Sequence, residues 1–311
     1  MKYLNLIRWP YLLILVIGQI LIKYAFFTPL LKVIYGSEYI PITLNDFGFS
    51  LIPAATVCLA AAGFIIHELY NVNSTTINLP YRIIKGEKIS VKKAFNLFFA
   101  LNVIGMLIGF YLSNMIGYPS FAVLFILTSA LLYASAKGLK KYFLIRAIIL
   151  SFLGALSFFA VALFDLFPQM NEDNAQTLTT FFSVIKDYSI FLFLLFFLRE
   201  QIINQKNRNE HHKNGWQTLT LSLGLESTRI IIFGITLLPV LAVIFYLYKY
   251  LYVHTLSLIY GLVFILAPLL LFALKLWAAK EEKDYDLLQK IISAVIFFSI
   301  LSIGLYQFIL K

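Results

Sequence analysis

The sequence predicts an all-α membrane protein built from nine transmembrane helices, and three observations predict it. Hydrophobic residues make up 61% of the 311 residues and charged residues only 13%, and the mean hydropathy is +0.86. Such a composition lies far outside that of soluble domains. Apolar stretches close to the roughly 20 residues that cross a bilayer recur along the whole chain. We therefore expect a single transmembrane domain over residues 1–311, with its function inside or at the surface of the bilayer.

The nine spans are placed where apolar residues run on with little interruption by charge. They are expected at residues 9–34, 47–70, 95–115, 119–136, 142–164, 178–198, 229–248, 254–278 and 287–309. The first lacks a small-residue cleavage site, so we interpret it as a retained helix rather than a signal peptide. Only residues 116–119 separate the third span from the fourth, which requires a tight helical hairpin there.

Basic residues gather in alternate connections. They lie before the first span and between spans 2 and 3, 4 and 5, 6 and 7, and 8 and 9, and they are Lys2, Arg8, Arg82, Lys85, Lys88, Lys92, Lys93, Lys137, Lys140, Lys141, Arg199, Lys206, Arg208, Lys213, Lys280 and Lys283. The other connections hold few bases, and their acidic residues are Asp46, Asp165, Glu172 and Asp173. By the positive-inside rule, the N-terminus is expected in the cytoplasm and the C-terminus outside, in a bacterial-type cytoplasmic membrane.

The net charge of +10 therefore falls mostly on the cytoplasmic face. This charge either reflects membrane topology alone or also attracts an anionic lipid or a diphosphate. The bases lie in connections beside the membrane and not in a separate binding domain, so no nucleic acid partner is expected.

Polar side chains crowd at the cytoplasmic ends of the second and sixth spans, in HELYNVNSTTINLPYR (67–82) and REQIINQKNRNEHHKNGWQTL (199–219). Both stretches contain three polar residues at i, i+3 and i+7: Glu68, Asn71 and Thr75, here named the first polar set, and Asn204, Asn207 and His211, the second polar set. This spacing places each set on one helix face. We predict that the two sets face each other across one cavity open to the cytoplasm, since polar groups at membrane depth need a shared polar space.

These stretches resemble the signatures of the UbiA superfamily of intramembrane prenyltransferases. The first signature is N-D-x-x-D-x-x-x-D-x-x-N-x-P followed by R-P-x-x-x-G-x-I-S. In this sequence His67 stands at the first Asn of the signature, and the first polar set stands at its three Asp positions. The residues that match the rest of the signature are Asn78, Pro80, Arg82, Gly86, Ile89 and Ser90. The second signature, R-E, D-x-x-D-x-x-x-D and N-G-x-x-T-L, is traced by Arg199, Glu200, the second polar set, Asn214, Gly215, Thr218 and Leu219. With IRWP at 7–10 and YASAKGLKK at 133–141, the resemblance spans essentially the whole chain.

The resemblance implies a UbiA-like bundle that transfers an isoprenyl group from a prenyl diphosphate to a small or lipid-like acceptor. In such enzymes the Asp positions hold Mg²⁺, a hard cation that prefers oxygen ligands and neutralises the charge of the leaving diphosphate. Only Glu68 of the six positions in the two polar sets is a carboxylate here. We therefore expect Mg²⁺ to bind much more weakly than in the family, and we assign neither a catalytic residue nor a metal ligand. The candidates for binding a diphosphate or a lipid headgroup are Asn78, Arg82, Lys88, Lys140, Lys206 and Arg208.

Three functions stay open at this point. The first is an active prenyltransferase with an altered metal site. The second is a non-catalytic member that binds an isoprenoid, a quinone-like molecule or an anionic lipid, or serves as the partner subunit of another protein. The third is a transporter, for which the adjacent charges of Lys186 and Asp187 inside the sixth span are weak support. A zinc site built from His67, His211 and His212 is less favoured than hydrogen bonding at the helix ends.

Overall fold

The computed structural model describes residues 2–36, 40–71, 89–139, 142–209 and 222–306. Within these ranges the chain is helical and has no strand, which confirms the predicted all-α class. The same ranges contain nine stretches long and apolar enough to cross a membrane: Trp9–Tyr35, Asp46–Tyr70, Val91–Met115, Pro119–Lys137, Phe143–Gln169, Ala175–Lys206, Leu225–Leu251, Thr255–Ala278 and Glu282–Leu305. The predicted count of nine spans is therefore confirmed for the described part of the chain.

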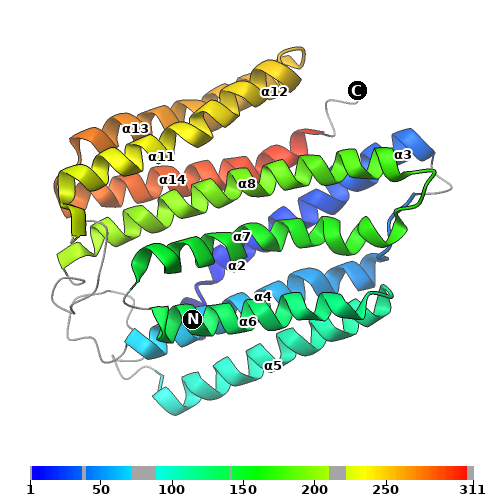
Figure 1. Cartoon of the computed structure of the whole chain (residues 1–311), viewed down its shortest axis with the longest axis horizontal. Coiled ribbons are helices and arrows are strands. Elements are labelled where there is room, and N and C mark those ends of the chain that lie inside the picture. Colours follow the sequence, from blue (N-terminus) through cyan, green and yellow to red (C-terminus); the bar gives the residue numbers. More distant parts are fainter. Residues whose placement is uncertain (1, 37–39, 72–88, 140–141, 210–221, 307–311) are drawn as a thin grey trace. The chain divides into compact units, whose positions relative to one another are not determined.

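Figure 1 colours the helices along the sequence, from blue at the N-terminus to red at the C-terminus. Their bounds are α1 Lys2–Leu6, α2 Trp9–Leu21, α3 Thr28–Tyr35, α4 Asp46–Asn71, α5 Val91–Met115, α6 Ala122–Lys137, α7 Phe143–Asp165, α8 Ala175–Lys206, α11 Leu225–Tyr246, α12 Thr255–Tyr260, α13 Ala267–Ala278 and α14 Glu282–Leu301. Single turns of π-helix continue three of the spans, at Ile22–Phe27, Leu247–Leu251 and Gly261–Leu266.

Two helices begin earlier than their apolar stretches, because polar residues cap them. The Oγ of Ser90 accepts a hydrogen bond from the backbone N–H of Lys93, so α5 begins at Val91 rather than at residue 95. Glu281 and Asp284 form a reciprocal capping box, so α14 begins at Glu282 rather than at residue 287. The polar ends of these helices therefore extend beyond the apolar runs that the hydropathy pattern marks.

Contacts along the chain divide it into two compact units. Unit 1 comprises Met1–Ile20, Tyr35–Lys140 and Leu156–Ile185, and unit 2 comprises Leu21–Ile34, Lys141–Ala155 and Lys186–Lys311. The first polar set belongs to unit 1 and the second to unit 2. The single domain over residues 1–311, and the cavity between the two sets, stay predictions.

In unit 1 a buried polar side chain ties three helices together. Gln19 on α2 is completely buried, and its Nε2 donates hydrogen bonds to the Oγ1 of Thr56 on α4 (2.9 Å) and to the carbonyl of Ser157 on α7 (2.8 Å). Because Gln19 is completely buried, its amide is removed from water and these hydrogen bonds satisfy its donors. Gln19 therefore fixes how α2 sits against its two neighbours.

Asp165 is a second buried anchor in unit 1. The sequence pattern placed it in an outer connection, but it is the last residue of α7 and is completely buried. Its Oδ1 accepts a hydrogen bond from the backbone N–H of Leu44 (2.9 Å). Its backbone carbonyl accepts from both the N–H and the Oγ1 of Thr43, each at 2.9 Å. The carboxylate therefore holds the segment that leads into α4, and it is not simply a marker of the outer face.

Close packing of α5 against α6 depends on Gly109. A Cβ placed on this residue would lie 2.2 Å from the ring of Phe125. We expect Gly109→Ala to lower the melting temperature of the purified protein, because a rigid ring has to move to make room. Gly234→Ala on α11 is the matched control, since nothing lies within 4 Å of a Cβ placed there. Equal melting temperatures for the two variants would contradict this account of the α5–α6 contact.

Tyrosine hydroxyls join the helices of unit 2. The hydroxyl of Tyr188 on α8 donates to the carbonyl of Ser299 on α14, and that of Tyr260 on α12 donates to the carbonyl of Phe298, both at 2.8 Å. Both bonds end on successive carbonyls of α14. This helix is therefore held by α8 and by α12 at one level.

Candidate functional site

The C-terminal end of α4 carries the first polar set. Glu68 is half-buried in the last turns of the helix, and Asn71 is its last residue. Thr75 lies outside the described residues, as do the headgroup candidates Asn78, Arg82, Lys88 and Lys140. The structure therefore places Glu68, the one carboxylate of the two sets, at a helix end of unit 1.

An arginine lies one helical turn from Glu68. Phe64 precedes Glu68 by four residues, so the two side chains share a face of α4. The guanidinium of Arg8 lies over the Phe64 ring, 5.3 Å from its centroid, and the Tyr11 ring lies 6.3 Å from the same ring. Arg8 has a positive φ of 52°, which turns the chain between α1 and α2. Sequence reasoning used Arg8 only as a topology signal, although the IRWP motif pointed to this position.

A pair of tyrosines connects α4 and α6 near the same end of α4. The hydroxyls of Tyr70 on α4 and Tyr133 on α6 are 3.0 Å apart, and their rings meet edge to face. The Nζ of Lys137 lies 5.6 Å from the centroid of the Tyr133 ring. The YASAKGLKK segment, whose resemblance to the family was noted above, is thus linked directly to the helix of the first polar set.

In unit 2 the C-terminal end of α8 carries the second polar set. Asn204 is buried, with 8% of its surface exposed, and Asn207 is half-buried. His211 lies outside the described residues. Two further amides were missed by sequence reasoning: Gln201 and Gln205 are each only 2% exposed. Their i, i+3 and i+4 spacing with Asn204 was the available signal, because it places all three on one buried face of α8.

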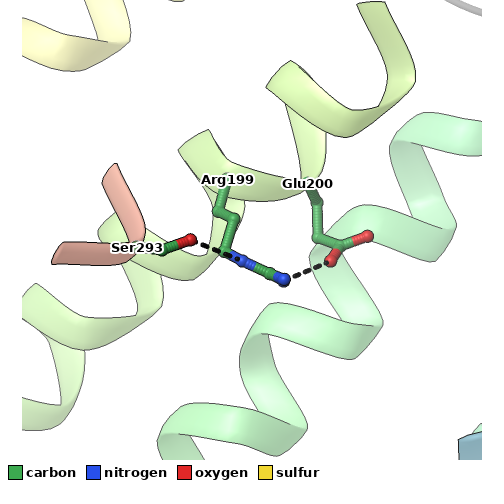
Figure 2. Close-up of polar contacts among 3 residues, drawn as sticks. All are labelled: Arg199, Glu200 and Ser293. Atoms are coloured by element: carbon green, nitrogen blue, oxygen red, sulfur yellow. Dashed lines mark hydrogen bonds and ion pairs between the residues drawn. The ribbon is translucent and has the colours of Figure 1, made fainter. Parts of the chain in front are cut away.

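The Arg-Glu pair of the second signature is a structural contact. The Nη1 of Arg199 lies 3.5 Å from the Oε1 of Glu200, and the Nε of Arg199 lies 3.4 Å from the Oγ of Ser293. Dashed lines mark both contacts in Figure 2. Ser293 belongs to α14, so Arg199 connects α8 to α14 within unit 2. These contacts favour a structural role for the pair, since Arg199 links Glu200 and Ser293.

Two of the bases nominated for headgroup binding have partners within unit 2. The Nζ of Lys206 forms an ion pair with Asp286 on α14. The Nη2 of Arg208 donates to the backbone carbonyl of Lys280 at 2.9 Å. The charge of Lys206 is thus balanced by a carboxylate, whereas Arg208 contacts a neutral carbonyl.

The Lys186–Asp187 pair does not form a buried charge. The Nζ of Lys186 lies 3.8 Å from the Oδ1 of Asp187, and the two side chains are 58% and 64% exposed. Both are far more exposed than the buried polar residues of α8. The pair therefore fits side chains that reach towards a polar surface, and it gives no support to a transport path.

The residues at the two polar sets do not fit a two-metal centre. The six positions offer one carboxylate, four amide or hydroxyl groups and one imidazole, whereas Mg²⁺ in proteins is held by carboxylates, phosphate oxygens and water. In the part of the chain that the structure describes, no three His, Cys, Asp or Glu side chains are grouped so that they could hold a metal ion. The donors at these positions therefore do not form the carboxylate-rich set that holds Mg²⁺.

Comparison with known proteins decides the family. The UbiA prenyltransferase family matches residues 37–309. The chain belongs to this family. The match covers residues 37–309, so the predicted membership of this family is confirmed.

The relatives of this UbiA-family protein include digeranylgeranylglyceryl phosphate synthases from archaea. It is 28% identical to the one from Sulfurisphaera tokodaii over 172 residues, which is 55% of each chain. It is 30% identical to those from Saccharolobus solfataricus (55% of each chain) and Sulfolobus acidocaldarius (56% of each chain). The chain therefore spans about half the length of the curated relatives it matches.

Two solved structures share the fold. One concerns digeranylgeranylglyceryl phosphate synthase in membranes; it has a TM-score of 0.60 and 18% identity and covers 97% of this chain and 98% of its own. The other is a UbiA homolog from Archaeoglobus fulgidus bound to GPP and Mg²⁺, with a TM-score of 0.56 and 13% identity over 98% of this chain and 100% of its own. This UbiA-family protein is thus a multi-pass membrane protein of the prenyltransferase fold.

Proposed function

We propose that this UbiA-family protein binds a prenyl diphosphate, or a lipid with a similar anionic headgroup, at a cytoplasmic mouth without Mg²⁺, and that it does not carry out the metal-dependent transfer of its family. The observation that carries the proposal is the replacement of five of six motif carboxylates by neutral groups or histidine. Each replacement removes a negative charge from the mouth and leaves the basic residues in place. An anion then no longer needs a metal to reach the site.

In this proposal basic side chains, and not a metal ion, bind the phosphate oxygens directly. Arg82 is the principal candidate, since a guanidinium binds phosphate through two parallel hydrogen bonds. Asn78, Lys88 and Lys140 accompany it in the sequence, and Lys206 contributes less because Asp286 compensates its charge. In a partly dehydrated mouth these charges are weakly screened and act strongly on a diphosphate.

The relatives suggest the class of ligand. Their name describes a lipid with geranylgeranyl groups on a glyceryl phosphate, and a structural neighbour holds GPP. A prenyl chain gains roughly 25 cal/mol for each Å² of apolar surface that it removes from water, so we expect apolar and aromatic residues to line its path above the mouth. A polar tunnel through the protein would instead favour a transporter.

A second candidate function is prenyl transfer by an altered metal site. The observation in its favour is the retention of Glu68 at a helix end of unit 1, in a chain that matches its family over residues 37–309. In this case Glu68 and the asparagine oxygens would be the surviving ligands, and diphosphate release would require Mg²⁺. The titration below separates the two functions.

The test is a calorimetric titration of the purified protein with GPP, with and without EDTA. We expect EDTA to change the affinity by less than about twofold. Arg82→Ala should weaken the affinity by roughly tenfold to a hundredfold, because a hydrogen bond to a charged group contributes about 1.5–3 kcal/mol. Lys283→Gln, an exposed base on α14, is the matched control for loss of one positive charge. Binding that disappears on chelation, together with diphosphate release when Mg²⁺ is added, would establish the second candidate instead.

A further inference from the structure

Two arginines of unit 2 meet at the C-terminal end of α13. The Nη1 of Arg229 on α11 donates to the carbonyls of Trp277 (3.0 Å) and Ala279 (3.1 Å). The Nη2 of Arg208, just beyond α8, donates to the carbonyl of Lys280 (2.9 Å). The carbonyls of Ala279 and Lys280 are consecutive in the chain, so two guanidinium groups are held close to each other.

These contacts leave both guanidinium groups with free donors. Each guanidinium has five N–H groups, and the Nη1 of Arg208 and the Nε of Arg229 have no acceptor among the described residues. Neither arginine is paired with a carboxylate in the described ranges. The nearby acids are engaged elsewhere: Asp286 pairs with Lys206, and Asp284 accepts from the backbone N–H groups of Lys280 and Glu281.

A buried phenol lies beside the arginines. Tyr285 on α14 is completely buried, and the centre of the Arg208 guanidinium lies 5.8 Å from the centroid of its ring. The charges of Arg208 and Arg229 both act on its hydroxyl, and this hydroxyl has no acceptor in the part of the chain that the structure describes. Each of the three side chains thus has one donor atom without an acceptor among the described residues: the Nη1 of Arg208, the Nε of Arg229 and the hydroxyl of Tyr285. Two like charges held together in this way are stabilised by an anion.

The two arginines lie at ends of membrane-spanning helices. Within unit 2, the C-terminal ends of α8 and α13 and the N-terminal ends of α11 and α14 lie at the same side of the helices (Figure 1). These are ends of membrane spans, where phospholipid headgroups lie. Trp277, whose carbonyl binds Arg229, is 60% exposed and packs edge to face on Phe233. An exposed tryptophan at the end of a span is typical of the membrane interface.

The geometry points to a phosphate-binding site formed by Arg208, Arg229 and Tyr285 that takes the headgroup of an anionic phospholipid. Guanidinium groups bind phosphate oxygens through paired N–H donors, and basic pockets between membrane helices are known to bind lipid headgroups. The acyl chains would lie along the apolar surface beside Trp277. This inference does not rest on the proposed function, because two of its three residues lie outside the proposed prenyl diphosphate site.

The test uses full-length protein freed of lipid in a neutral detergent. Its melting temperature is followed while phosphatidylglycerol, phosphatidylcholine or inorganic phosphate is added at constant ionic strength. We expect phosphatidylglycerol to raise the melting temperature by mass action and phosphatidylcholine to do so much less. The lipid concentration at half of the maximal shift should increase roughly tenfold in Arg229→Gln, the worth of a hydrogen bond to a charged group.

Two further variants test the site if Arg229→Gln is unstable. Tyr285→Phe removes only the unpaired hydroxyl, so it should weaken phosphatidylglycerol binding without lowering the melting temperature measured in the absence of lipid. Tyr260→Phe is its matched control, because it removes a hydroxyl that is hydrogen-bonded to Phe298. It should lower the melting temperature and leave lipid binding unchanged.

Three outcomes would overturn the inference. In the first, phosphatidylglycerol shifts the wild type, Arg229→Gln and Tyr285→Phe equally, and the arginines only cap α13. In the second, inorganic phosphate alone stabilises the protein, and the ligand is not a lipid. In the third, the carboxylate of Glu210, which follows Arg208 by two residues in the sequence, occupies the donors; Glu210→Gln then abolishes the effect of Arg229→Gln on the stability measured without lipid.

Discussion

Restoring aspartate at the five altered motif positions is expected to make prenyl diphosphate binding depend on Mg²⁺. The variant carries five substitutions: Asn71→Asp, Thr75→Asp, Asn204→Asp, Asn207→Asp and His211→Asp. With Glu68 it regains six carboxylates, the ligands that draw Mg²⁺ out of its hydration shell. Even outer-shell partners of a metal are worth about 10–100-fold in metal affinity, so the restored carboxylates should give at least roughly a tenfold dependence of GPP affinity on Mg²⁺.

The measurement is a GPP titration of this variant with Mg²⁺ and with EDTA. The matched control carries Thr75→Asn and His211→Asn, which gives neutral side chains of the same shape at all five positions. The control should respond to Mg²⁺ as weakly as the wild type. The melting temperature is a second readout: Asn204 is only 8% exposed, so an aspartate there is destabilising until a cation pairs with it. A variant that binds GPP no better with Mg²⁺ than its control would contradict this explanation of the lost carboxylates.

Replacing Asp165 by alanine should produce a large loss of stability in unit 1. The change leaves the N–H of Leu44 without its acceptor in a buried position. Loss of one partner of a buried hydrogen bond to a charged group costs about 2–3 kcal/mol. We expect this decrease in the free energy of unfolding, measured by denaturation in mixed micelles.

Two controls identify the cause of that loss. Asp165→Asn keeps an acceptor oxygen at the position of Oδ1, so it should lose less stability than Asp165→Ala. Asp173→Ala removes an exposed aspartate from the following connection and should change stability by less than about 0.5 kcal/mol. The buried-anchor interpretation fails if Asp165→Ala is as stable as Asp173→Ala.

The class of fold was predictable because a bilayer restricts what can cross it. Spanning segments have to be helices that satisfy their own backbone hydrogen bonds, so apolar runs of sufficient length were enough to predict nine of them. The starts of α5 and α14 were less predictable, since Ser90 and Glu281 extend these helices through polar residues. Hydropathy marks the membrane-embedded part of a helix and not its capped end.

The buried polar residues show what sequence patterns could not predict. Asp165 was read from its charge as part of an outer connection, because a charge count contains no information on burial. Gln201 and Gln205 were missed because the family signature directs attention to positions 204, 207 and 211. The Arg208–Arg229 pair was also missed: the two residues are brought together by the carbonyls of α13, and no local spacing in the sequence connects them.

The most direct test of the central claim is a density map of the protein with GPP in EDTA. The claim is that a prenyl diphosphate is received by basic side chains without a metal. We predict density for the diphosphate in contact with Arg82, with no ion between the phosphate oxygens and the protein. Density that is absent in EDTA, and that appears with Mg²⁺ bound to Glu68 and the asparagine oxygens, would contradict the claim.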